Sequence, residues 1–393
     1  MAVGIGLSHF LNDFLNTKGL EYRAFEPKRF FTIYSKISYL FNKPTKTIQV
    51  VGTNGKGSTA HFLAKMLESS GKTVGLYTSP HLFKINERIV LNSKHITDDE
   101  LQVEHLKLLS ILDDDAKNIS YFEYLTLLAY SFLSNKCEYL ILEAGLGGEF
   151  DATSAFEKDL LLITPIGIDH KEFLGDTIEA IAGTKLEAMN CDTIISEQIN
   201  KVLCIAEKKA KDKKVCLIES GKLLDKDEAD ICLQTCIDNK FASFLSANLM
   251  LSASAFKYLG FEPTMDVMPA TKPSGRFERI ASNIIIDVGH NEACAKAIKD
   301  ELNNKQVQLV YNSLREKDFK AVLSILKPNI VEIEIIDIDN ERVLAREELE
   351  NFLKQNGISY KNFIGISDDK EYLVFGSFLV VQKFIETLNE TTK

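Results

Sequence analysis

The sequence has no long uninterrupted apolar segment. No run approaches the roughly 18 residues that a helix needs to cross a bilayer. The stretch from Met1 to Phe14 carries Asn12 and Asp13 in place of a basic segment followed by an apolar one, so it does not resemble a secretion signal. We therefore expect a cytoplasmic protein that does not bind membranes.

Cysteine pairs are also missing. The chain has seven cysteines, an odd number, and none of them forms a C-x-x-C motif. This pattern favours reduced thiols over a disulfide framework or a zinc site.

The sequence also lacks an excess of positive charge. The formal net charge is -10, whereas a nucleic-acid backbone requires clustered lysine and arginine. We expect small-molecule substrates, no nucleic-acid partner and a monomer. Any anionic substrate would have to be held by a local group of basic residues.

At 393 residues the chain is longer than one hydrophobic core usually organises. The segment 269–275 contains two prolines, a serine and a glycine, which is typical of a linker. We predict an N-terminal domain over residues 1–272 and a smaller C-terminal domain over 273–393.

Apolar runs alternate with amphipathic stretches, which predicts an α/β fold with parallel sheets covered by helices. We expect Asp98 to cap the helix that follows it. Ligands would bind at the carboxyl ends of the strands. The predicted strands are 47–51, 72–78, 139–142 and 160–166 in the first domain and 284–287, 308–311, 331–338 and 372–375 in the second; the predicted helices are 58–70, 99–112, 121–133 and 241–259.

The segment Gly52–Thr59 has the composition of a phosphate-binding loop between a strand and a helix. Glycines let backbone N–H groups approach phosphate oxygens, and Lys56 supplies a positive charge for the β- and γ-phosphates. The loop is not a strict Walker A motif, because Val50 takes the place of the first glycine and Gly57 follows the lysine. The alternative is an ordinary glycine-rich turn.

A series of ordered motifs covers most of the chain. It comprises 52–59, Ser79-Pro80-His81-Leu82, Asn86-Glu87-Arg88-Ile89, 143–148, Asp151-Ala152-Thr153, Ile168-Asp169-His170, 172–177, Gly275-Arg276-Phe277-Glu278, Asp287, His290-Asn291 and Glu316-Lys317-Asp318. This series resembles the folylpolyglutamate synthases and dihydrofolate synthases of the Mur ligase superfamily.

The resemblance implies a P-loop ATP-binding domain followed by a Rossmann-like α/β domain. It also implies a bifunctional ATP-dependent ligase that adds L-glutamate to dihydropteroate and to folate polyglutamates through an acyl phosphate. A monofunctional folylpolyglutamate synthase is the first alternative. A cell-wall Mur ligase, in which the lysine usually precedes Thr or Ser directly, and a P-loop switch or motor module are the others.

Glu143 follows an apolar strand, which puts a carboxylate at the sheet edge that faces the loop and suits Mg²⁺. By resemblance two Mg²⁺ sites are expected, and Lys185 would carry a carbamate, which converts a cation into an oxygen ligand. The metal ligands implied are Ser58, Ser79, Glu143, His170 and Lys185. The ATP-binding residues implied are Asn54, Gly55, Lys56, Gly57, Ser58, Thr59, Asn248, Arg276, Asp287 and His290.

Family similarity assigns contact with the acceptor to Phe122, Glu123, Asp151 and Ala152, and Tyr22, Phe25 and Tyr121 are further aromatic candidates. Catalysis would rest on Lys56, His170, Lys185 and Asp151, without an enzyme nucleophile. The chain departs from the family pattern at Thr184, where a glutamate is usual, and at Leu245, where a glutamine is common. It also departs at Glu149 and Ser154, where a basic residue and an asparagine are usual.

Overall fold

The coordinates are a computed structural model that describes residues 10–19 and 26–391. The chain divides into two compact units, and the last break lies at Pro269–Ala270, inside the predicted linker. A functional domain boundary at residues 272 and 273 stays a prediction. The first unit contains Met1–Ile166, Ala182–Cys232 and Ala247–Pro269; the second contains Gly167–Ile181, Leu233–Ser246 and Ala270–Lys393.

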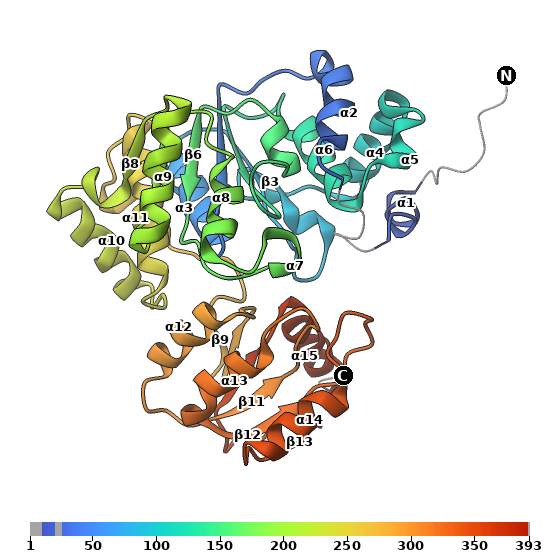
Figure 1. Cartoon of the computed structure of the whole chain (residues 1–393), viewed down its shortest axis with the longest axis vertical. Coiled ribbons are helices and arrows are strands. Elements are labelled where there is room, and N and C mark those ends of the chain that lie inside the picture. Colours follow the sequence, from blue (N-terminus) through green and yellow to red (C-terminus); the bar gives the residue numbers. More distant parts are fainter. Residues whose placement is uncertain (1–9, 20–25, 392–393) are drawn as a thin grey trace. The chain divides into compact units, whose positions relative to one another are not determined.

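An eight-stranded sheet with the order β4-β3-β2-β5-β1-β6-β7-β8 forms the centre of the first unit (Figure 1). Strand β1 (Lys46–Val51) lies between β5 (Tyr139–Glu143) and β6 (Leu160–Ile163) and is parallel to both. The expected parallel sheet is confirmed, except that β3 and β4 are antiparallel at one edge. The remaining strands are β2 (Val74–Tyr77), β3 (Ile89–Leu91), β4 (Lys94–His95), β7 (Thr193–Ile195) and β8 (Leu217–Glu219).

Helices cover this sheet, and the most buried of them is α6 (Tyr121–Leu133), in which every residue from Phe122 to Leu133 is buried. Its aromatic and aliphatic side chains extend the core between the sheet and α1, α2 and α4. The helices are α1 (Leu11–Asn16), α2 (Arg29–Ile37), α3 (Lys56–Ser69), α4 (Asp98–Leu112), α5 (Asp115–Asn118), α9 (Asn200–Lys213) and, shared with segments of the second unit, α8 (Ile178–Leu186), α10 (Lys226–Asp238) and α11 (Leu245–Tyr258).

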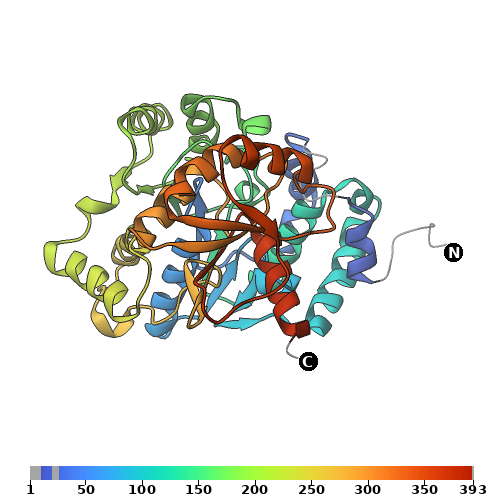
Figure 2. The ribbon, with the colours of Figure 1, turned by 90° about the horizontal axis from the view of Figure 1, so that it is seen from below.

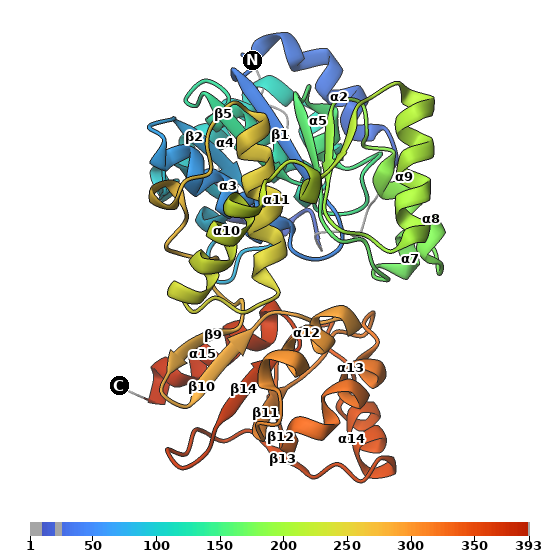
Figure 3. The same cartoon turned by 90° about the vertical axis from the view of Figure 1, so that its left-hand side faces the viewer.

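The second unit has a six-stranded sheet with the order β13-β12-β11-β14-β10-β9, parallel except for β9. Helices α12, α13 and α14 pack on one face and share a core with the strands (Figure 3). The red helix that ends at the C label in Figure 2 is α15. The elements are α7 (Lys171–Leu174), β9 (Glu278–Ala281), β10 (Ile284–Asp287), α12 (Glu292–Leu302), β11 (Val307–Tyr311), α13 (Phe319–Leu326), β12 (Ile330–Ile335), α14 (Arg346–Gln355), β13 (Tyr360–Asn362), β14 (Tyr372–Phe375) and α15 (Phe378–Thr391).

Some predicted ends differ from the structure. Asp98 is not the cap of α4: it is the first residue of the helix, and the Thr97 hydroxyl accepts from the Glu100 N–H while the Glu100 carboxylate accepts from the Thr97 N–H. The strand expected over 160–166 ends at Ile163, because the chain leaves the sheet before Pro165. The helix expected from residue 241 begins at Leu245.

Within residues 10–19 and 26–391, no helix has both the length and the apolar character that a membrane crossing requires.

Candidate active site

The phosphate-loop candidate connects β1 to α3 at the carboxyl end of the sheet. Its glycines are required by close packing. A Cβ on Gly52 would lie 1.9 Å from Thr164 Oγ1, and one on Gly55, which has φ +84°, would lie 2.1 Å from Asn248 Oδ1. Asn248 is buried on α11 and lines the loop, so the structure brings this predicted ATP-binding residue to the predicted loop.

Two hydroxyls at the start of α3 are buried without a partner. In the described part of the chain, neither Ser58 Oγ nor Thr59 Oγ1 forms a hydrogen bond. A buried unpaired hydroxyl costs about 1–3 kcal/mol, and a bound ligand would offset this cost. The Lys56 ammonium donates to the Thr53 carbonyl oxygen at 3.2 Å, at the mouth of the same turn. The local geometry therefore suits phosphate and a cation.

Glu143 and Ser79 lie together beside this loop. The Ser79 N–H donates to Glu143 Oε2 at 3.0 Å. A Cβ on Gly57 would lie 3.1 Å from the same oxygen, so the carboxylate faces the loop as predicted. No group of three or more His, Cys, Asp or Glu side chains forms a metal cluster among the described residues. The donor set fits Mg²⁺, which commonly takes one carboxylate, waters and substrate phosphates.

Lys185 is buried on α8, with 3% of its surface exposed. Its ammonium donates to the Gly52 carbonyl oxygen at 2.8 Å. Lys185 is therefore not an exposed helix lysine, and its side chain contacts the phosphate loop in the interior of the first unit. Gly148 packs against the backbone of the same residue, because a Cβ there would lie 2.3 Å from the Lys185 oxygen.

Asp151 organises the loop that follows β5. It accepts hydrogen bonds at 2.9 Å from the N–H groups of Gly145, Leu146 and Thr153, and another from the Thr153 hydroxyl. Burial raises the pKa of its carboxyl group, although these hydrogen bonds oppose the shift. Ala152 is buried at the start of the short 3₁₀ helix η3 (Ala152–Ala155).

The predicted acceptor residues Phe122 and Glu123 begin α6. Gly145 packs on Phe122, since a Cβ there would lie 2.5 Å from the ring. Glu123 accepts from the Ser120 N–H at 2.8 Å and from Arg29 Nη2 at 2.6 Å, and both its carboxylate and the guanidinium are nearly buried. Sequence reasoning missed Arg29, because 94 residues separate the partners and no motif contains it.

The aromatic candidates before the loop, Tyr22 and Phe25, lie outside the described residues.

In the second unit, Asp287 ends β10 as predicted and is buried. It accepts from the N–H groups of Gly289 at 2.7 Å and Phe277 at 2.8 Å. Burial raises the pKa of this carboxyl group, and the Arg276 charge opposes the rise. The Arg276 guanidinium lies over the Phe378 ring, 5.4 Å from its centre.

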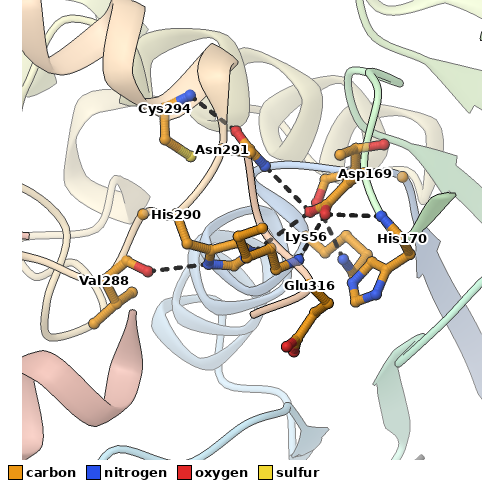
Figure 4. A network of polar contacts seen from close by, with 12 residues as sticks. Lys56, Asp169, His170, Val288, His290, Asn291, Cys294 and Glu316 are labelled. Carbon is orange, nitrogen blue, oxygen red and sulfur yellow. Dashed lines mark hydrogen bonds and ion pairs between the residues drawn. The ribbon is translucent and has the colours of Figure 1, made fainter. Parts of the chain in front are cut away.

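Asp169 connects several polar residues of the same unit (Figure 4). Its carboxylate lies 2.6 Å from Lys317 Nζ, 3.2 Å from Asn291 Nδ2 and 3.4 Å from His290 Nε2. It also accepts from the His170 N–H at 2.8 Å. Burial alone would raise the pKa of Asp169, but His290 and Lys317 hold it well below its usual range.

The structure also shows what Asn291 and His170, two residues of the sequence motifs, do in the fold. The Asn291 side chain also accepts from the Cys294 N–H at 3.0 Å and so caps α12. His170 has φ +50° at the start of α7, a conformation that is uncommon outside glycine. Sequence reasoning did not predict the buried pair of Asp169 and Lys317, because its members lie 148 residues apart.

The fold and the loop define an ATP-binding ligase of the Mur type, and residues 50–222 match the family model of the Mur ligase middle domain. A dihydrofolate synthase/folylpolyglutamate synthase of Buchnera aphidicola subsp. Schizaphis graminum is 30% identical over 383 residues, and the match covers 88% of this chain and 89% of the relative. The chain belongs to the dihydrofolate synthase/folylpolyglutamate synthase family.

Solved structures of this family have the same fold as this chain. The crystal structure of Helicobacter pylori folylpolyglutamate synthetase is 38% identical, with a TM-score of 0.78, and the match covers 98% of this chain and 100% of that one. Escherichia coli FolC in complex with DHPP and ADP shares the fold, with a TM-score of 0.80, 22% identity and 98% of each chain covered. The α/β fold class predicted from the sequence is confirmed.

Proposed function

We propose that this protein is a cytoplasmic, monomeric ligase that uses ATP to add L-glutamate to dihydropteroate and to folate (poly)glutamates. The observation that carries the proposal is the phosphate loop at the carboxyl end of a parallel sheet, with the Glu143 carboxylate facing it, in a chain of this family. That arrangement supports the transfer of a phosphoryl group to an acid.

The chemistry has two steps, because a carboxylate does not react with an amine until it carries a better leaving group. An oxygen of the acceptor carboxylate bonds to the γ-phosphorus of ATP while the bond to the β,γ-bridging oxygen breaks, which gives an acyl phosphate and ADP. The amine nitrogen of glutamate then attacks the acyl carbon. The tetrahedral intermediate expels phosphate, and the nitrogen loses a proton. Positioning and charge stabilisation carry such reactions.

The loop residues would hold the nucleotide. The N–H groups from Gly55 to Ser58 and the Lys56 ammonium would contact the β- and γ-phosphates. The N–H groups of Asn54 and Thr59 already donate to the carbonyl oxygens of Pro165 and Gly55. The unpaired Ser58 hydroxyl, with Ser79 and Glu143, would hold one Mg²⁺. When bound, Mg²⁺ neutralises charge on the transferred phosphoryl group.

His170 and Lys185 are the proposed ligands of a second Mg²⁺, and Lys185 would need a carbamate because an ammonium has no lone pair. An uncharged Lys185 amine can bond to the carbon of CO₂ and lose a proton to water, which gives the anion. Protein incubated with ¹³C-labelled bicarbonate should give a carbamate carbon resonance that disappears in Lys185→Arg. A spectrum without that resonance would remove the carbamate from the proposal.

Arg276, Asp287 and His290 are the proposed nucleotide contacts from the second unit, with Asn248 on the adenine side. Phe122, Glu123, Asp151 and Ala152 are the proposed acceptor contacts. Asp151 would act mainly by fixing the loop after β5, because four hydrogen bonds within that loop already engage its carboxylate.

The relatives differ in whether they carry one activity or two. The Buchnera relative is named for both synthase activities, which favours a bifunctional enzyme. The Helicobacter protein, which is more similar over nearly the whole chain, is named only as a folylpolyglutamate synthetase. A monofunctional folylpolyglutamate synthase is therefore the second candidate.

Purified protein with ATP, Mg²⁺ and glutamate distinguishes these candidates when dihydropteroate and tetrahydrofolate are supplied in turn. Mass spectra of the products should show one added glutamate with each acceptor, and phosphate release should depend on both acceptor and glutamate. Product from tetrahydrofolate alone would select the monofunctional enzyme. Undiminished glutamate incorporation by Lys56→Ala would contradict the proposed role of the loop.

A further inference from the structure

The first unit has a surface pocket that the proposed reaction does not yet use. Its volume is about 480 Å³, and it lies between α2 and the loop after β5. The rings of Phe31 and Phe150 meet edge to face on its wall, with their centres 6.5 Å apart. The lining residues are Lys28, Phe31, Thr32, Ser35, Glu149 and Phe150.

The pocket has one cation and one anion. Lys28 and Glu149 are both exposed, and within the described ranges neither side chain takes part in an ion pair or a hydrogen bond. Both charges are therefore available to a bound molecule. A charged ligand in the pocket would be attracted by one of these residues and repelled by the other.

The wall that carries Glu149 is held in place on both sides. On one side, Gly148 packs against the Lys185 backbone so closely that a Cβ would clash, and its carbonyl oxygen accepts a hydrogen bond from the Ser154 hydroxyl. On the other side, Asp151 is fixed by the amides of its own loop. The position of Glu149 is therefore set by the loop and does not depend on a partner of its own.

Each charged residue lies within two positions of a residue that belongs to the proposed acceptor contacts or holds one of them in place. Glu149 lies two positions before Asp151. Lys28 directly precedes Arg29, whose guanidinium holds the Glu123 carboxylate through Nε at 3.1 Å and Nη2 at 2.6 Å. The pocket therefore shares the start of α2 and the loop after β5 with the residues that form or hold the proposed acceptor contacts.

We propose, on the basis of the function proposed above, that Lys28 and Glu149 set the preference among acceptors by their charge. Dihydropteroate carries only the carboxylate that reacts, whereas every glutamyl residue already attached adds one more carboxylate. Glu149 repels these additional carboxylates and Lys28 attracts them. The balance between the two residues determines how readily the enzyme extends a glutamate chain.

Steady-state kinetics with dihydropteroate and with tetrahydrofolate that carries one or three glutamyl residues test this proposal. In Glu149→Lys, KM for the triglutamate should fall by about 3- to 10-fold, and in Lys28→Gln it should rise by a similar factor, as expected for exposed charges. KM for dihydropteroate should change by less than about 2-fold in both. High salt should reduce the differences, because it screens exposed charges.

Lys36→Gln is the matched control, since it removes an exposed lysine of the same helix that pairs with Asp115 and does not line the pocket. Its kinetics should match the parent protein. Equal changes in KM for all acceptors in Glu149→Lys, or changes that high salt does not alter, would overturn the proposal. Absence of ligation by the parent protein with every acceptor would instead overturn the proposed function.

Discussion

At the scale of single residues, Gly55 is the clearest case of a position that only glycine fits. Its φ of +84° and the nearby Asn248 oxygen both exclude a Cβ. We expect Gly55→Ala to weaken ATP binding by at least about 10-fold, because the loop or Asn248 must move. Isothermal titration calorimetry with a non-hydrolysable ATP analogue measures this change.

Gly71 provides the control for that experiment. Its φ of +75° is similar, but a Cβ there would meet no atom within 4 Å. Gly71→Ala should therefore cost about 1 kcal/mol of stability from backbone strain alone and leave ATP affinity unchanged. Equal losses of affinity in the two variants would show that the contact with Asn248 is unimportant.

Lys158 is a second residue whose surroundings affect a measurable property, the free energy of unfolding. Its Nζ is buried and has no hydrogen-bond partner in the described part of the chain. Burial lowers the pKa of this ammonium from 10.5 to about 8. The folded protein therefore disfavours the charged form of Lys158. Below about pH 8 this lowers the free energy of unfolding by its full amount, and the loss becomes smaller between about pH 8 and the ordinary pKa of 10.5.

We expect Lys158→Met to raise the free energy of unfolding by about 2–3 kcal/mol at about pH 7. The gain should shrink as the pH rises towards 10.5, where the unfolded chain also loses the proton. Urea unfolding at a series of pH values measures it. Lys208→Met, which changes an exposed lysine of α9, should show neither the gain nor its pH dependence.

At the scale of elements, a buried ion pair attaches the segment before α7 to the rest of the second unit. The side chains of Asp169 and Lys317 are 8% and 5% exposed and 2.6 Å apart. Asp169→Asn would leave the lysine without its counter-charge, so we expect a loss of about 3–5 kcal/mol. Asp169→Asn combined with Lys317→Met should recover most of this loss, and a double-mutant cycle in urea measures the coupling.

The pair of Lys36 and Asp115 is the control, because it has a similar distance of 2.7 Å but exposed fractions of 55% and 32%. Asp115→Asn should cost less than about 1 kcal/mol. A coupling energy for Asp169 and Lys317 no larger than that of the exposed pair would contradict the proposed contribution of burial.

Elements with strong periodicity or apolar runs were predictable from the sequence. Helix α6 and strands β10 and β14 have the predicted bounds, because each is a largely apolar segment with polar residues at its limits. Strands β3, β4, β7, β8, β9 and β13 were not predicted. They have only two to four residues, most of them lie at sheet edges, and such short strands carry too little pattern to be recognised.

The candidate site was predictable where local motifs define it. The loop from β1 to α3, and Glu143 at the end of β5, follow from strand ends and glycines. Arg29 and the partner of Asp169 could not be found, because contacts between residues 94 and 148 positions apart depend on the tertiary fold.

At the scale of the whole molecule, the cysteines show how burial controls reactivity. Only Cys204 and Cys216 of the seven are exposed. Burial raises the pKa of Cys137 and Cys294 to about 12 and of Cys191 and Cys236 to about 11. Since the thiolate is the reactive form, two thiols should react quickly with a disulfide reagent in the native protein and all seven in denaturant.

The double variant Cys204→Ser and Cys216→Ser should lose the fast phase of that reaction. Absorbance of the released thiol, with mass spectrometry of the labelled peptides, identifies which residues react. Rapid labelling of buried Cys232 in the native protein would contradict the burial described.

The second unit is assembled from three separate stretches of the chain. During synthesis, Asp169 leaves the ribosome 148 residues before Lys317, so its carboxylate lacks this lysine partner until the last third of the protein appears. A C-terminal fragment that starts at residue 270 would lack that carboxylate altogether. Such a fragment should be poorly soluble alone and should be rescued by co-expression with residues 1–269.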